Sequence, residues 1–128
     1  MIETKSIQKP DEAAGLWLVK VLLGVLIIII LTIHLIVNHF IGEGALLTWQ
    51  DVVDYFANPW IVFMEITFLV VVVSHSLIGM RSIILDLNPS KGTMKIVDWV
   101  LSIIGVVSTV YGIWLALKIA SFSCLLYT

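Results

Sequence analysis

The sequence is poor in charged residues and in cysteine. Only 12% of its 128 residues are charged, whereas a soluble domain carries about 25%. Hydrophobic residues reach 60%, which excludes a soluble globular domain and, more firmly still, an intrinsically disordered chain. The net charge of -2 includes no basic excess that would indicate nucleic-acid binding. The single cysteine, Cys124, excludes an internal disulfide framework and any metal or iron–sulfur site built from cysteine.

Long apolar runs are present instead, and each exceeds the ~20 residues that cross a bilayer core of about 30 Å. They occupy residues 16–41, 60–85 and 96–119. Because only helices satisfy their backbone hydrogen bonds inside lipid at this length, the runs predict an all-α integral membrane protein with three transmembrane helices. No repeat or second domain is visible, so residues 1–128 are predicted to form a single membrane-anchor domain. Three helices alone make a poor bundle, so we expect them to form part of a heteromeric helix bundle.

Lysine and arginine are distributed unevenly among the segments outside the spans. They stand before or at the start of the first span (Lys5, Lys9 and Lys20) and around the second link, residues 86–95 (Arg81, Lys91 and Lys95). The first link, residues 42–59, contains none, and only Lys118 lies near the far end of the third span. The positive-inside rule therefore predicts a multi-pass protein with its N-terminus in the cytoplasm and its C-terminus outside. Within the first link, residues 48–56 favour a short interfacial helix capped by Thr48.

The second span carries His75 at membrane depth, where ionisable residues are expensive and usually functional. At about 100° per residue, Phe68, Gly79, Ser82 and Asp86 lie within about 40° of His75, on one stripe of the helix. A glycine one turn from a histidine lets a flat macrocycle lie against the helix, so His75 and Gly79 predict a haem site. Haem needs only one imidazole from each side, and ligation on both sides suits electron transfer.

Other polar residues lie near this stripe or on the first span. Arg81 is off the stripe, at a height from which it could reach a haem propionate or a quinone oxygen. His34 lies about 10 Å and His75 about 22 Å from the outer edge, so each is predicted to serve a different haem, completed by a partner subunit. The alternative for each histidine is a hydrogen bond to a neighbouring helix. Glu65 is either a paired acid between helices or a proton carrier, and His39 is predicted to meet the outer headgroups.

The second span also contains a motif that resembles one in a known family. A histidine is followed by a glycine four residues on and an aspartate eleven residues on, here His75, Gly79 and Asp86. This pattern, with the run His75–Arg81, resembles the smaller hydrophobic anchor subunit of succinate dehydrogenase (succinate:quinone oxidoreductase). The resemblance implies that His75 is an axial ligand of haem b and that Asp86, with Ser82 one turn away, lies at the quinone pocket. Many members have a quinone-binding tyrosine after the aspartate, where this chain has Leu87.

The first span and first link resemble a subclass of the same family that holds two haems. The segments concerned are His34–Phe40, Asp51–Val53 and Asn58–Pro59. In that subclass a histidine of the first helix is also a ligand, which implies that His34 binds haem iron. The resemblance covers roughly residues 16–118.

The resemblance also implies a division of labour within a complex. A flavoprotein subunit oxidises succinate, an iron–sulfur subunit relays the electrons, and this chain with a second hydrophobic anchor subunit forms the quinone site beside haem b. The chain would then supply no catalytic residue of its own, and we expect it in the plasma membrane of a prokaryote. The alternatives are a structural or assembly subunit without haem, an anchor of a fumarate reductase, or an anchor of another quinone-linked dehydrogenase.

Overall fold

The computed structural model describes residues 14–41 and 48–126, and every regular element in these ranges is helical. The elements are α1 (Ala14–Ile36), the π-helical turn η1 (Val37–Ile41), α2 (Trp49–Tyr55), α3 (Pro59–Asp86) and α4 (Lys91–Leu126). Three helical stretches are long and apolar enough to cross a membrane, namely Ala14–His39, Pro59–Asp86 and Lys91–Leu125. The prediction of an all-α protein with three membrane-spanning helices is therefore confirmed.

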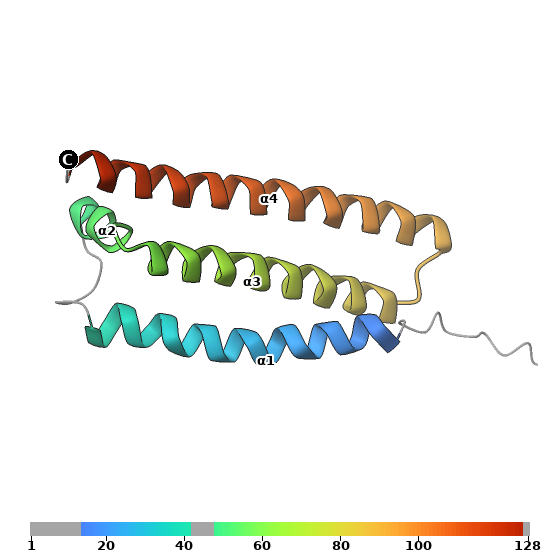
Figure 1. Cartoon of the computed structure of the whole chain (residues 1–128). Coiled ribbons are helices and arrows are strands. Elements are labelled where there is room, and N and C mark those ends of the chain that lie inside the picture. Colours follow the sequence, from blue (N-terminus) through green and yellow to red (C-terminus); the bar gives the residue numbers. More distant parts are fainter. Residues whose placement is uncertain (1–13, 42–47, 127–128) are drawn as a thin grey trace, which may run out of the picture.

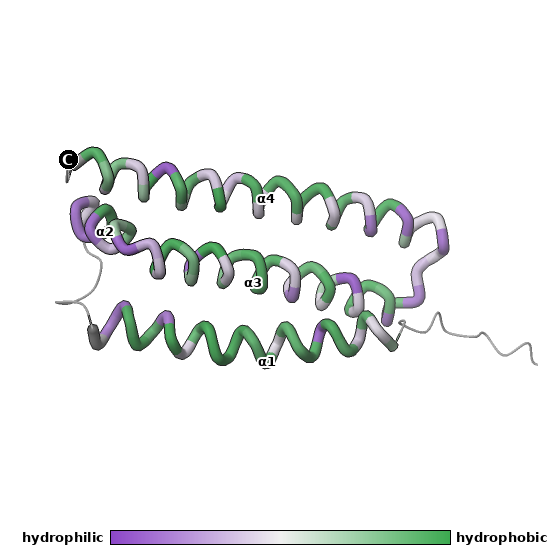
Figure 2. Tube along the Cα trace, in the orientation of Figure 1, coloured by the Kyte–Doolittle hydropathy of each residue, from purple (hydrophilic) through white to green (hydrophobic). Residues whose placement is uncertain are grey.

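The three long helices lie side by side, with α3 between α1 and α4 (Figure 1). The N-terminal end of α1 and the α3–α4 link lie at one end of this layer, and α2 lies at the other (Figure 1). Apolar residues cover the helices along most of their length (Figure 2). Among the described hydrophobic residues only Ile30, Val53 and Val71 are buried. A helix that is apolar on all sides is stable in contact with lipid or with another apolar subunit. Both faces of this layer could therefore pack against the helices of a partner subunit in a heteromeric bundle.

Side-chain caps fix the ends of the helices at the α2 end of the layer. The Thr48 hydroxyl accepts a hydrogen bond from the Asp51 N–H at 3.2 Å, and the Asp51 carboxylate accepts one from the Thr48 N–H at 2.8 Å. This reciprocal capping box starts α2, which confirms the short helix predicted with Thr48 as its cap. Asn58 caps α3 by accepting from the Trp60 N–H, with Pro59 in the first turn.

Helix α4 extends beyond the apolar run, residues 96–119, at both ends. Its 36 residues correspond to about 54 Å, longer than a bilayer core. Ser90 starts the helix early, because its hydroxyl accepts from the Thr93 N–H at 3.1 Å. At the far end the buried Ser123 donates a hydrogen bond to the Val53 carbonyl oxygen. The last turns of α4 thus pack against α2. The hydropathy of the sequence does not predict this contact.

Glycine allows α3 to approach its two neighbours. A Cβ built on Gly105 would stand 2.5 Å from Leu77 Cδ1, and one built on Gly112 would stand 2.5 Å from Leu69 Cδ2. Both leucines therefore fill notches in α4, as small residues in membrane helices commonly permit. The counterpart on α1 is Gly24, which admits the ring of a histidine from α3, described below.

Candidate functional site

His75 of α3 points at α1 and bonds to its backbone. Its Nδ1 lies 3.2 Å from the carbonyl oxygen of Lys20. Because a carbonyl only accepts, Nδ1 carries the proton and Nε2 keeps its lone pair. A Cβ on Gly24 would stand 3.3 Å from His75 Cε1, so the missing side chain lets the ring approach. Within the described ranges no residue hydrogen-bonds to Nε2. An imidazole oriented through Nδ1–H to a carbonyl, with Nε2 available, is the usual arrangement of a metal-binding histidine.

The surroundings of His75 combine open space with polar groups. A Cβ built on Gly79, one turn further along α3, meets nothing within 4 Å. Two turns from His75, the Ser82 hydroxyl accepts a hydrogen bond from Lys20 Nζ at 2.9 Å and donates one to the Ile78 carbonyl oxygen at 3.1 Å. Lys20 therefore holds His75 with its backbone and reaches Ser82 with its side chain. Sequence reasoning used Lys20 only as an orientation signal, although its place near the edge of an apolar run was visible.

This part of the chain fits one side of a haem. It offers one oriented imidazole and an adjoining helix surface without a side chain at Gly79. It does not offer a second imidazole, because the other two histidines lie toward the opposite end of the layer: His34 pairs with Glu65, ten residues before His75 on α3, and His39 lies in η1. The described residues also contain no group of three or more histidine, cysteine, aspartate or glutamate residues able to hold a metal ion. A bis-imidazole centre would therefore need a second polypeptide.

His34 lies in a closed hydrogen-bond cluster with both ring nitrogens engaged. Its Nδ1 lies 2.9 Å from Glu65 Oε1, and its Nε2 lies 3.0 Å from the Asn38 amide nitrogen. The amide donates to Nε2, so Nδ1–H donates to the carboxylate. Phe68 stacks on the ring with centroids 5.2 Å apart. Iron ligation through Nε2 would require the Asn38 amide to move aside, so this arrangement favours the alternative in which His34 joins two helices.

Glu65 is the residue of this cluster to which both His34 and Tyr55 are hydrogen-bonded. Its Oε1 also accepts a hydrogen bond from the Tyr55 hydroxyl at 2.6 Å, which links α2 to α1 and α3. Burial, together with the hydrogen bond and the charge of Glu65, raises the pKa of the Tyr55 hydroxyl well above its usual range. Asn38 lies in η1, and its Oδ1 is a buried polar atom without a partner among the described residues. Of the two roles considered for Glu65, the geometry matches the paired acid between helices.

The two histidines lie at different heights along α3. His34 is level with Glu65 and Phe68, whereas His75 lies ten residues beyond Glu65, a rise of about 15 Å. This separation agrees with the depth estimate from sequence. One haem held between the two rings of this chain is therefore ruled out by distance.

Arg81 faces α4 rather than the His75 stripe. Its Nε donates to Asp98 Oδ1 at 2.7 Å and its Nη2 to Asp98 Oδ2 at 3.4 Å. With side chains about one third and two fifths exposed, such a pair contributes about 0–1 kcal/mol. The sequence assigned Arg81 to a propionate or a quinone because Asp98 belongs to another helix and its approach was not visible. Asp86 is exposed in the last turn of α3, and no described residue forms a hydrogen bond or ion pair with its carboxylate.

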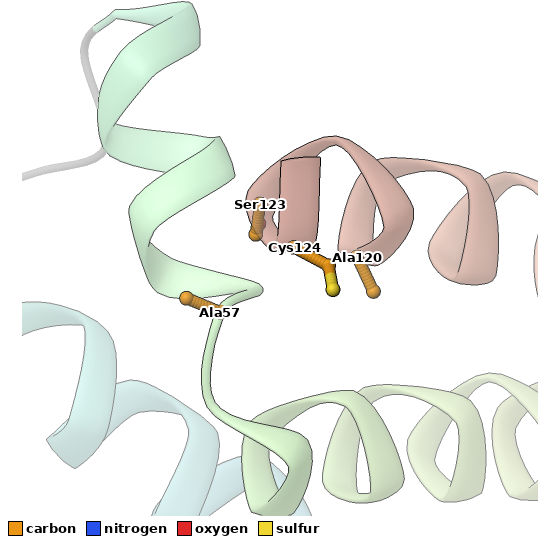
Figure 3. Close-up of a pocket in the computed structure, with 4 residues that line it drawn as sticks. All are labelled: Ala57, Ala120, Ser123 and Cys124. Carbon is orange, nitrogen blue, oxygen red and sulfur yellow. The ribbon is translucent and has the colours of Figure 1, made fainter. Parts of the chain in front are cut away.

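A cavity lies at the α2 end of the layer, opposite the end that carries Ser82 and Asp86. This cavity measures about 410 Å³. Its lining residues Ala57, Ala120, Ser123 and Cys124 come from the α2–α3 link and the end of α4 (Figure 3). The described residues that line it include no carboxylate, imidazole or cationic group. These lining residues are therefore not of the types that suit haem ligation or quinone protonation.

Comparison with known proteins gives a consistent family. Residues 3–114 match the profile described as "Succinate dehydrogenase/Fumarate reductase transmembrane subunit". A "Succinate dehydrogenase hydrophobic membrane anchor subunit" of Archaeoglobus fulgidus is 28% identical over 119 residues, covering 93% of this chain and 100% of the relative. A protein of the same description from Thermoplasma acidophilum is 26% identical over 97 residues, covering 76% of this chain and 79% of the relative. No solved structure matches the chain.

Proposed function

This chain belongs to the family of succinate dehydrogenase/fumarate reductase transmembrane subunits, and we propose that it holds haem b and helps to form the quinone site of such a complex. Its role as a membrane anchor subunit follows from the family match and the three spanning helices. The haem and quinone roles are the proposal. The observation that carries them is the orientation of His75, with Nδ1 bonded to the Lys20 carbonyl oxygen and Gly79 open beside it.

His75 would bind the haem iron through Nε2, and a second anchor subunit would supply the opposite ligand. The Lys20 carbonyl oxygen fixes the orientation of the ring and directs its Nε2 lone pair away from α1, as outer partners of ligating histidines do. Gly79 would leave room for the porphyrin face. Haem b held by two imidazoles supplies one-electron transfer and no open coordination position. His34 is not included, because Asn38 already uses its Nε2 lone pair. The proposal therefore includes one haem ligand from this chain, whereas the resemblance to the two-haem subclass implies two.

The quinone role is assigned to the end of α3 that follows His75. Ser82 and the Lys20 ammonium, 2.9 Å apart, form a polar pair one turn from the exposed Asp86. The Lys20 ammonium can donate a hydrogen bond to a quinone oxygen, and the Ser82 hydroxyl can do so when it turns away from the Ile78 carbonyl oxygen. The Asp86 carboxylate can pass protons from water. Leu87 has no group for either task. By the positive-inside rule this end faces the cytoplasm, where we place the iron–sulfur and flavoprotein subunits.

The test is the haem content of the complex purified with this chain. His75→Gly should lose one b-type haem per complex in a reduced-minus-oxidised spectrum, and added imidazole should restore the band by occupying the vacated position. The His34→Gly complex should retain the haem bound by His75. The matched control is His39→Gly, which alters an exposed histidine and should also retain that haem. Unchanged haem in His75→Gly would overturn the assignment. Loss of haem in His34→Gly with rescue by imidazole would restore the two-haem assignment.

A further inference from the structure

A cavity of about 360 Å³ lies between the end of α3 and the start of α4. It lies on the α4 side of α3, whereas His75 and Ser82 bond to α1 on the other side. Its polar lining consists of Arg81, Lys91, Lys95 and Asp98. Its apolar lining includes Met94 and Trp99. The cavity therefore pairs a cationic rim with an apolar wall.

The positive charge at this cavity is not neutralised within the described chain. Arg81 is paired with Asp98, but no described residue forms an ion pair with Lys91 or Lys95. Both lysines stand in the first two turns of α4, and the first turn of this helix contains no acidic residue. Cations at a helix N-terminus are unfavourable because the helix dipole is positive there. A bound anion would offset both the lysine charges and the dipole.

The walls indicate what kind of anion fits. Trp99 is 66% exposed and continues the cavity onto the apolar outer surface of α4. The site also lies where α3 ends and α4 begins, the level at which lysine and tryptophan meet the lipid headgroups. A free phosphate would contact only the cationic rim, whereas a phospholipid would contact the rim with its phosphate and the apolar wall with its glycerol and acyl carbons. Basic pockets between membrane helices on the cytoplasmic side are suited to anionic headgroups.

We propose that the cavity between α3 and α4 binds the phosphate headgroup of an anionic phospholipid, with Lys91 and Lys95 facing the phosphate and Met94 and Trp99 facing the glycerol and upper acyl carbons. The lipid would join the two helices at a link that contains a turn residue with positive φ, Asn88 at 54°. This site shares neither His75 nor Ser82 with the proposed haem and quinone sites. Arg81, which the sequence pattern placed near a haem propionate or a quinone, lines this cavity instead and is paired with Asp98.

The test is native mass spectrometry of the delipidated complex titrated with phosphatidylglycerol and with phosphatidylcholine. The wild type should retain phosphatidylglycerol preferentially. Lys91→Gln with Lys95→Gln should weaken that binding about 25-fold, since each cation contributes roughly a factor of five. Replacement of both by arginine should preserve it. The control is Lys118→Gln, an exposed lysine at the other end of α4, which should change nothing.

Several outcomes would overturn the proposal. One is equal retention of the two lipids by the wild type. Another is displacement of phosphatidylglycerol by millimolar inorganic phosphate, which would assign the site to a soluble anion. A third is loss of an associated subunit from the glutamine variant with its lipid count unchanged, which would assign the lysines to protein docking. If the glutamine variant does not assemble, brominated phosphatidylglycerol should still quench wild-type fluorescence more than that of Trp99→Phe, and equal quenching would refute the site.

Discussion

Replacing Glu65 tests whether the cluster at the α2 end holds three elements together. Its Oε1 accepts from Tyr55 on α2 and from His34 on α1, at 2.6 and 2.9 Å. Glu65→Leu leaves two donors without an acceptor. An unsatisfied buried donor costs about 1–3 kcal/mol, but the His34 and Glu65 side chains are 26% and 18% exposed, and hydrogen bonds between membrane helices average only about 0.6 kcal/mol. We therefore expect a loss of about 2 kcal/mol in all.

The measurement is a thermal-unfolding series on the purified complex. Glu65→Gln keeps an oxygen acceptor and should lie between wild type and Glu65→Leu. Thr67→Val is the control, because the Thr67 hydroxyl bonds only within α3, to the Phe63 carbonyl oxygen at 2.7 Å. In a double-mutant cycle, Glu65→Leu and Tyr55→Phe should be coupled by about 0.5–1 kcal/mol. Additive effects of these two substitutions, or a Glu65→Leu variant as stable as Thr67→Val, would refute the reasoning. Haem content should be the same throughout, since His75 lies about 15 Å away.

Further predictions concern the haem face and the ionisation of a tyrosine. Gly24→Val should push the His75 ring off α1 and alter the haem spectrum, because even a Cβ would stand 3.3 Å from the ring; an unaltered spectrum would contradict this contact. Gly79→Val should be harmless to helix packing within this chain, where a Cβ meets no neighbour, yet lower haem occupancy if a porphyrin covers it; full occupancy would place the porphyrin elsewhere. Tyr55 should remain protonated above its ordinary pKa of about 10, since its pKa is raised. Its contribution to stability is then complete below pH ~10 and is lost as pH rises further, which a difference ultraviolet titration against Tyr55→Phe would detect.

Local chemistry in the sequence determined the class of the protein and several helix ends. Apolar runs that exceed the bilayer thickness can satisfy their backbone only as helices, so the three spans followed from length and composition. The cap of α2 was also local, because Thr48 and Asp51 are three residues apart. Helix periodicity also placed His75 and Gly79 on one stripe of α3. That stripe predicted the residues of this chain on one side of the candidate haem site.

Only the tertiary structure decided which residues pair across helices. His75 meets Lys20 at a separation of 55 residues. His34 meets Glu65 at a separation of 31, and Arg81 meets Asp98 at a separation of 17. In a soluble protein an apolar stripe indicates which face packs, but helices that are apolar on all sides carry no such signal, because lipid and a neighbouring helix are equally apolar. The polar partners were therefore decided by how the helices pack in the assembled layer, where Gly24 lets the His75 ring approach α1.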